Sequence, residues 1–171
     1  MSKAFTKEDD LGTQPVLRPL VSLVPEGAKN YLTAKGAARL QDELGRSLNE
    51  QRPALLVAGA SAREENREAL MRLDQRIAYL QQSLRSAEIA TLPPLPHDVV
   101  RFGATVDVRD ARGQTLRYRI VGVDEAEPEH NAVSWLSPIA RALLNARLGQ
   151  RVPFRFPAGL TQLEITAITY E

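Results

Sequence analysis

The chain has 171 residues, of which 43% are hydrophobic and 5% aromatic, with 22 Lys+Arg against 21 Asp+Glu. The hydrophobic content excludes a wholly disordered chain, and the net charge of +1 gives no basis for tight, sequence-independent binding of nucleic acid. The absence of cysteine excludes disulfides, thiolate zinc sites and a cysteine nucleophile. Without a long apolar stretch or a signal-peptide core, the sequence predicts a cytoplasmic protein.

The sequence divides into four segments of different composition. Residues 1–30 mix charged residues with prolines and show no sustained period, which predicts a flexible leader. Residues 31–91 are rich in Ala, Leu, Arg, Gln and Glu, which favour helices. Residues 92–96, Leu-Pro-Pro-Leu-Pro, predict a stiff linker through which no helix can continue. In residues 97–171, Val, Thr and Ile with intervening Gly and Pro predict short strands.

The middle segment carries the clearest periodicity of the chain. Its apolar residues recur at alternating spacings of three and four: Leu70, Leu73, Ile77, Leu80, Leu84 and Ala87. A looser apolar stripe precedes them: Ala37, Leu40, Leu44, Leu48 and Leu55. This pattern predicts two antiparallel helices, over about 33–58 and 62–87, that pack as a coiled-coil hairpin. Because two helices bury little core, we expect the outer part to stand in solvent as a finger of about 40 Å.

Local signals place the turn of the hairpin at residues 59–61. Gly59 suits the left-handed position that follows a helix, and Ser61 with Glu64 fits a capping box at the start of the next one. Pro53 lies inside the first helix and lacks an amide donor, so we expect a kink or a restart there.

The C-terminal segment predicts a small α+β domain with four or five strands around one short helix. Alternating apolar residues, separated by turn-forming residues, indicate strands over residues 105–109, 115–121, 132–135, 151–156 and 163–170. Ser137 followed by Pro138 is typical of a helix start, with serine as the N-cap and proline at the first helical position. We expect this helix to run to Leu144.

No set of residues forms a recognisable catalytic motif. His97 and His130 lie beside acids but lack the spacing of a metal-binding pair, and the chain has no glycine-rich phosphate loop. Ser61, Ser134 and Ser137 have no base nearby in the sequence, and cap or strand positions account for them. The sequence therefore predicts a protein without an active site of its own.

The one chemically suggestive place is the hairpin tip, which we define by its residues: Arg63, Glu64, Glu65, Asn66, Arg67 and Glu68. Extending the apolar seam backwards from Leu70 reaches Asn66 and Arg63, so the seam turns polar here. One interpretation is a solvated helix start, in which the acids lie near the positive end of the helix dipole and pair with Arg67 and Arg72. The other is an acidic tip that meets a metal ion held by a partner, because hard cations prefer carboxylate oxygens.

Three motifs resemble those of one bacterial family. The run Val133–Leu144, VSWLSPIARALL, resembles the family pattern I-S-x-[ND]-S-P-[IM]-A-R-[AG]-L. Tyr118–Gly122 resembles the family strand [YF]-x-I-V-G, and Tyr31–Gly36 resembles the family opening x-[LV]-T-x-x-G. On these residues, most of the chain after the leader is similar to the Gre transcript-cleavage factors and their relatives. The stretch Pro96–Val100 is also similar to the Rnk-type, short-hairpin branch of the same superfamily.

The resemblance implies a fold, a partner and a set of site residues. It implies an N-terminal antiparallel helical hairpin on a C-terminal FKBP-like domain. The partner would be RNA polymerase, bound by a monomer at the secondary channel, with indirect contact to nascent RNA and DNA and none to a membrane. Glu64 and Glu65 would reach toward Mg²⁺ shared with the polymerase, and no cofactor of the protein's own is implied. The polymerase-docking residues would be Leu136, Ser137, Pro138 and Arg141.

Three departures from the family pattern bear on function. The family tip reads like G-D-x-S-E-N-A, and its acids help to hold the second catalytic Mg²⁺. Here Glu65 and Asn66 match the E-N pair, but the family aspartate falls on Ala60 or Ala62. Each arm of the hairpin is also shorter by roughly five or six residues, which is about 8–9 Å of reach. Finally, Leu136 replaces the family Asn or Asp that precedes Ser-Pro.

We therefore expect a non-enzymatic transcription regulator that binds RNA polymerase, inserts its hairpin into the secondary channel and stimulates little or no cleavage. One alternative is a transcript-cleavage factor that rescues backtracked polymerase, with the chemistry belonging to the polymerase. A second alternative is an FKBP-like peptidyl-prolyl isomerase. That activity needs an aromatic-lined pocket, and four Phe, four Tyr and one Trp over 171 residues are too few.

Overall fold

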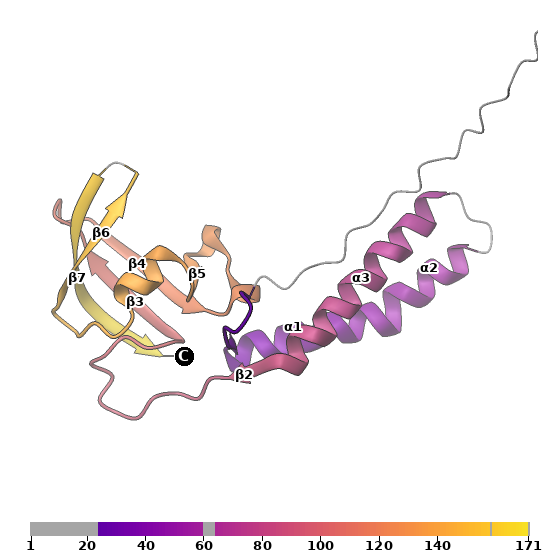
Figure 1. Cartoon of the computed structure of the whole chain (residues 1–171), viewed down its shortest axis with the longest axis horizontal. Helices are drawn as coiled ribbons and strands as arrows, with labels where there is room; N and C mark the ends of the chain where they lie inside the picture. The colour runs from indigo at the N-terminus through magenta and orange to yellow at the C-terminus, as the bar shows by residue number, and fades with distance from the viewer. Residues whose placement is uncertain (1–23, 60–63, 158, 171) are drawn as a thin grey trace, which may run out of the picture.

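The computed structural model describes residues 24–59, 64–157 and 159–170. A helical hairpin forms one end of the molecule and a curled β-sheet domain forms the other (Figure 1). This arrangement confirms the predicted α+β fold class. Arg63 of the tip and the residues 60–62 lie outside the described residues. Within the described part of the chain, no helix is both long and apolar enough to cross a membrane.

The first arm of the hairpin has three helical pieces: α1 (Ala34–Arg46), a π-helical turn η1 (Ser47–Gln51) and α2 (Arg52–Gly59). Thr33 caps α1, because its Oγ1 accepts a hydrogen bond from the Gly36 amide at 2.9 Å. Pro53 lies in the first turn of α2, where a missing N–H costs little, so the α-helix restarts there as expected. Gly59 is the last residue of α2 and not the residue after it, which corrects the predicted helix end.

The second arm is a single helix, α3 (Glu64–Ser86), of 23 residues and therefore about 35 Å long. Among the described residues of the hairpin, the apolar core lies at the base, where β1, α1 and α3 contribute four buried side chains: Leu32, Ala37, Leu40 and Leu80. Along the rest of the predicted seam, Ile77 is buried, whereas Leu70 and Leu73 are only half-buried. The apolar period runs along most of α3, but the core occupies only its C-terminal half.

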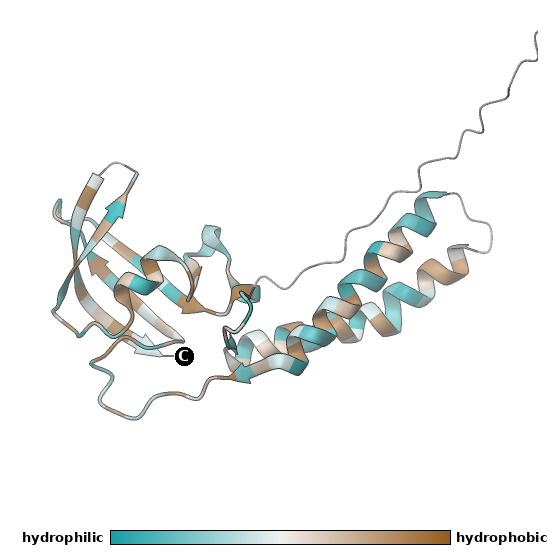
Figure 2. Ribbon diagram, in the orientation of Figure 1, coloured by the Kyte–Doolittle hydropathy of each residue, from teal (hydrophilic) through white to brown (hydrophobic). Residues whose placement is uncertain are grey.

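Farther from the base, ion pairs join the two arms. Arg76 of α3 donates hydrogen bonds of 2.7 and 3.0 Å to the Glu43 carboxylate of α1, and Arg52 donates one of 2.7 Å to Asp74. Four large apolar side chains of the hairpin are exposed, most of them on the first arm: Leu48, Leu56, Val57 and Met71. Part of the α2 ribbon has the colour of hydrophobic residues (Figure 2). Two ion pairs therefore join the arms beyond the apolar core at the base.

A short parallel strand pair closes the base of the hairpin. It consists of β1 (Asn30–Leu32) and β2 (Ala87–Ile89), with Asn30 opposite Ala87. The sequence analysis assigned Asn30 to the leader and Ala87 to the second helix, and both assignments were wrong. Strands of three residues are too short for a period of two to be recognised.

Five strands form the C-terminal sheet: β3 (Ala104–Arg109), β4 (Thr115–Val121), β5 (Ala132–Ser134), β6 (Arg151–Phe156) and β7 (Gly159–Tyr170). Their spatial order is β5-β4-β3-β7-β6, and all neighbours are antiparallel except β4 and β5. β7 begins earlier than predicted, because its first residues pair with β6. A register shift at Asp107 and Val108 against β7 marks a bulge, which increases the curl of the sheet.

The helix α4 (Pro138–Leu143) packs against the sheet, and its apolar face joins the larger of the two hydrophobic cores. Two 3-10 turns, η2 (Val123–Glu125) and η3 (Pro128–His130), connect β4 to β5. The loop that carries η2 reaches the base of the hairpin. Residues 90–98, which include the predicted linker, contain neither helix nor strand.

Candidate functional site

The predicted docking residues lie together where β5 leads into α4. Ser137 is the N-cap of α4, with its Oγ accepting a hydrogen bond from the Ala140 amide at 3.3 Å, and Pro138 is the first helical residue. The Leu136 amide donates a hydrogen bond of 3.2 Å to the last residue of β5, so the turn is fixed on both sides. Leu136 is half-buried, whereas Pro138 and Arg141 are exposed. We call residues 136–138 the docking loop.

The hairpin tip is the second predicted site, and its described residues begin α3. Glu64 and Glu65 are exposed in the first turn of the helix, where carboxylates are favoured by the helix dipole. Arg67 lies 3.6 Å from Glu64, and Arg72 lies 3.0 Å from Glu68. Two of the three acids therefore have a basic neighbour on the same helix.

The tip acids do not fit a metal site of the protein's own. No group of three or more His, Cys, Asp or Glu side chains that could hold a metal ion occurs among residues 24–59, 64–157 and 159–170. Glu64 and Glu65 are consecutive in a helix, and consecutive helical side chains do not face a common point. Asn66 is half-buried and adds no charge. Glu64 and Glu65 therefore point in different directions from the first turn of α3.

The docking loop belongs to the sheet domain, whereas the start of α3 lies at the far end of the hairpin (Figure 1). The structure brings the docking residues together and the described tip residues 64–68 together, and α3 extends about 35 Å from these tip residues to the base of the hairpin. Any influence of docking on the position of the tip must pass through the contacts between the hairpin and the sheet domain. We call these contacts, between the base of the hairpin and the loop 122–127, the junction.

A buried carboxylate lies at the centre of the junction. Glu125 of η2 is 6% exposed. It accepts hydrogen bonds from the Thr33 amide at 2.9 Å, from the Thr33 hydroxyl and from the Gly122 amide at 3.0 Å. A buried carboxylate is tolerated only when hydrogen bonds satisfy its oxygens. Glu125 therefore holds the capping residue of α1 firmly to the loop of the sheet domain.

Two glycines permit this close approach. A Cβ on Gly36 would lie 2.0 Å from the carboxyl carbon of Glu125, and a Cβ on Gly122 would lie 2.4 Å from the carbonyl oxygen of Tyr31. Real Cβ atoms do not come so close to other heavy atoms. Glycine is therefore required at both positions because of packing, and not because of a special backbone conformation.

Charged residues attach both arms of the hairpin to the same loop. Asp124 accepts hydrogen bonds from the hydroxyls of Tyr79 and Ser83, which both lie on α3. Arg39 of α1 pairs with Glu127 and also donates a hydrogen bond of 3.2 Å to the Asp124 carbonyl oxygen. The hydrogen bond from Arg39 lowers the pKa of the Glu127 carboxyl group. The arms are thus held together at their base and to the sheet domain.

An aromatic cluster links the junction to the docking loop. The ring centroid of Tyr31 lies 5.5 Å from that of Phe102 and 5.4 Å from that of Trp135. Trp135 directly precedes Leu136 of the docking loop. The first strand of the hairpin therefore packs against the segment that carries the predicted docking residues.

Comparison with known proteins identifies the family. The family model "Transcription elongation factor, GreA/GreB, C-term" matches residues 95–170. The transcription elongation factor GreB of Neisseria meningitidis serogroup A is 36% identical over 155 residues, which cover 83% of this chain and 94% of that protein. This chain belongs to the GreA/GreB family of transcription elongation factors. The family assignment confirms the resemblance that the sequence motifs indicated.

GreA and GreB relatives match this Gre-family chain about equally well. The transcription elongation factor GreA of Nitratidesulfovibrio vulgaris is 35% identical over 152 residues, which cover 82% of this chain and 94% of that protein. Among solved structures, GreA factor homolog 1 (Gfh1) of Thermus thermophilus is 25% identical, with 83% of this chain and 99% of that chain covered and a TM-score of 0.40. The alignment with N. meningitidis GreB spans 155 positions but includes only 83% of the 171 residues of this chain. About a dozen aligned positions of that relative therefore have no counterpart in this chain.

The sequence analysis of this Gre-family chain missed the residues of the junction. Gly36 and Gly122 each end a motif that resembles the family, T-x-x-G and I-V-G, and this position was the available signal for a packing role. Glu125 stands in the run Val-Asp-Glu-Ala-Glu, where no local feature separates the buried acid from its neighbours.

Proposed function

We propose that this Gre-family protein binds RNA polymerase through its sheet domain, inserts the hairpin into the secondary channel and stimulates little or no transcript cleavage. The observation that carries the proposal is the hairpin tip, which stands about 35 Å from the base of α3 and has Ala60 or Ala62 where the family motif has an aspartate. The docking loop would contact the rim of the channel. The protein would then regulate transcription by occupying the channel.

The chemistry of the tip supports weak or absent cleavage stimulation. Help in hydrolysis requires an acid within about 2–2.5 Å of a catalytic metal ion. The position where the family motif places an aspartate holds Ala60 or Ala62, so one expected ligand is missing. Glu64 has Arg67 at 3.6 Å, and a nearby cation reduces the attraction of a carboxylate for a metal ion. Glu65 remains as an exposed acid without an ion pair among the described residues.

The length of the hairpin supports the same conclusion. About a dozen positions of the alignment with N. meningitidis GreB face gaps in this chain. We attribute them to the hairpin arms, where the spacing between motifs is shorter by roughly five or six residues on each arm. The lost reach is about 8–9 Å. Since metal–oxygen distances tolerate deviations of only a few tenths of an ångström, a rotamer change at the tip cannot make up this difference.

The junction supports a role in which the hairpin and the sheet domain move as one body. Both arms are bonded to the loop 122–127, and Tyr31 of the hairpin packs on Trp135 beside the docking loop. The position of the docking loop on the polymerase would then determine where the tip points. Such a rigid body would exclude relatives with longer hairpins from the same channel, so we expect competition with them.

A single attached probe tests the insertion of the hairpin. Because the chain has no cysteine, Glu65→Cys introduces one thiol, to which an iron chelate that generates hydroxyl radicals can be attached. We expect the bound protein to cut the polymerase inside the secondary channel. The matched variant Arg112→Cys, in the exposed turn between β3 and β4, should cut only outside the channel. The same cutting pattern from both positions would contradict insertion.

The runner-up function is a transcript-cleavage factor, and the exposed carboxylates of Glu64 and Glu65 favour it. Both acids lie at the end of the hairpin and are open to a partner. The two functions share the partner and the binding site. They differ in one outcome, which is whether the protein alone shortens the RNA of a backtracked complex.

A further inference from the structure

A pocket of about 130 Å³ opens at the junction, and neither the docking loop nor the tip uses it. It lies between α1 and the sheet domain, and its charged lining comes from both sides: Lys35, Arg39, Arg119, Glu125, Glu127 and His130. Its uncharged lining is small, since Gly36, Val121 and Ala132 contribute little volume. The pocket is therefore a polar cavity between two domains.

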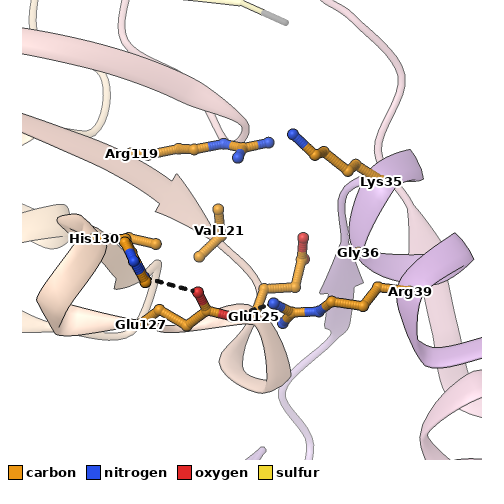
Figure 3. A pocket seen from close by; sticks show the side chains of 9 residues that line it. Lys35, Gly36, Arg39, Arg119, Val121, Glu125, Glu127 and His130 are labelled. Carbon is orange, nitrogen blue, oxygen red and sulfur yellow. Dashed lines mark hydrogen bonds and ion pairs between the residues drawn. The ribbon is translucent and has the colours of Figure 1, made fainter. Parts of the chain in front are cut away.

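The acids of this pocket already have partners, but two of its cations do not. Glu125 accepts three hydrogen bonds within the junction, and Glu127 pairs with Arg39 and lies 3.2 Å from the His130 ring. Lys35 and Arg119 have no acid and no hydrogen-bond acceptor for their side chains among the described residues. Figure 3 shows these two side chains pointing toward each other across the pocket. Like charges that face each other without a counter-charge repel, so the arrangement favours an anion between them.

We propose that this pocket binds a small anion with a phosphate group, held between Lys35 and Arg119. A guanidinium group donates two parallel hydrogen bonds to phosphate oxygens, and an ammonium group donates to the remaining ones. A tetrahedral phosphate offers oxygens in several directions and can accept from both sides at once, whereas a carboxylate offers two oxygens in one plane. A phosphate group with two negative charges also matches the two positive charges of Lys35 and Arg119.

The volume of the pocket limits what can enter it. Sites for whole drug-sized ligands measure about 300–1,000 Å³. A cavity of about 130 Å³ accommodates a phosphate group and excludes a nucleoside. Free pyrophosphate and the terminal phosphates of a nucleotide share this chemistry, and in the second case the base would remain outside.

Binding at this place would connect the two halves of the molecule. Lys35 belongs to the hairpin and Arg119 belongs to the sheet domain, so an anion between them adds a bridge to the junction beside Glu125. A ligand that binds only the folded, closed junction also raises the melting temperature. The site needs no polymerase, so its test is independent of the function proposed above.

Isothermal titration calorimetry of the full-length protein with pyrophosphate tests the proposal. We expect saturable binding with a Kd of about 1 mM or below. Lys35→Gln and Arg119→Gln should each raise the Kd about tenfold, because each removes charge-assisted hydrogen bonds, and Lys35→Arg should retain binding. The matched control is Arg112→Gln, which removes the same charge from an exposed turn and should leave the Kd within about twofold.

Further titrations identify the source of the phosphate group and include the outcomes that would overturn the proposal. If a nucleoside triphosphate binds with the same Kd as pyrophosphate, the terminal phosphates of a nucleotide are ligands. If its Kd is much higher, the ligand is the free anion. Lys35 is exposed, so Lys35→Gln should fold normally, and its melting temperature should no longer rise with pyrophosphate. Equal binding of acetate, equal weakening by Arg112→Gln, or no saturation below about 10 mM would overturn the proposal.

Discussion

The carboxylate of Glu125 lies in the space that the first atom of any side chain at position 36 would need. A Cβ built on Gly36 comes within 2.0 Å of the Glu125 carboxyl carbon. The same carboxylate accepts hydrogen bonds from Thr33, which caps the helix that contains Gly36. The hairpin therefore meets the sheet domain at a point where one residue lacks a side chain and the other ends in a buried charge.

Gly36→Ala should disrupt the junction. Overpacking typically costs about 1–3 kcal/mol, and a shift that breaks the hydrogen bonds of a buried carboxylate adds to that cost. Gly45→Ala is the matched control, since Gly45 lies in the same helix with nothing within 4 Å of its added Cβ. Alanine there should stabilise the helix by up to about 1 kcal/mol. Urea unfolding measures both, and equal stability of the two variants would contradict the described junction.

Leu80→Ala should destabilise the hairpin more than Leu73→Ala does. Leu80 is fully buried in the core at the base, and removal of such a side chain costs about 2–5 kcal/mol. Leu73 is half-buried farther out, so its truncation leaves a smaller cavity. Thermal unfolding of the two variants gives the comparison. A larger loss for Leu73→Ala would mean that the apolar core extends to the outer half of the hairpin.

The pair Glu43–Arg76 should make hairpin stability depend on pH. Hydrogen bonds from Arg76 lower the pKa of Glu43 below its ordinary value of 4.5 in the folded state. Its contribution is therefore complete above about pH 4.5 and is lost as the pH falls through the lower folded-state pKa. Because the pair is partly exposed, we expect only about 0.2–1 kcal/mol.

The measurement is the unfolding free energy of wild type and Glu43→Gln as a function of pH. The difference between them should be largest near neutral pH and should shrink below about pH 4. A difference that stays constant over this range would assign the effect of the substitution to helix propensity or packing instead of the ion pair.

Leu136→Asp should weaken polymerase binding by about 1–3 kcal/mol if the leucine is buried in the complex. The side chain is half-buried in the free protein, and the turn that carries it is fixed by hydrogen bonds on both sides. Leu160→Asp is the control, because Leu160 is an exposed leucine on β7, away from the docking loop. Competition with a labelled Gre relative measures both affinities, and equal effects would mean that docking uses another face.

The elements that could be predicted from the sequence are those whose cause is local. The strand β4 alternates between polar and apolar residues from Thr115 to Ile120, and the start of α4 depends on Ser137 and Pro138 alone, so both were placed correctly. The seam of α3 predicted a helix but not the extent of its core. Leu73 and Leu80 occupy equivalent seam positions, seven residues apart, but only Leu80 belongs to the buried core at the base of the hairpin.

The junction could not be predicted, because its contacts are distant in sequence. Thr33 and Glu125 are 92 residues apart, and Asp124 lies 41 residues from Ser83. No period or turn rule connects such residues. The family resemblance pointed to the segments that contain Gly36 and Gly122, but the reason for glycine there becomes visible only when the carboxylate of Glu125 is placed beside them.

The most direct test of the proposed function is RNA shortening in a backtracked elongation complex. The protein is added alone, and then together with a cleavage-competent Gre relative. We expect little or no shortening by the protein alone and a concentration-dependent loss of the relative's cleavage, because both would occupy the same channel. Robust shortening by the protein alone, abolished by the double substitution Glu64→Ala and Glu65→Ala, would contradict this account and identify a transcript-cleavage factor.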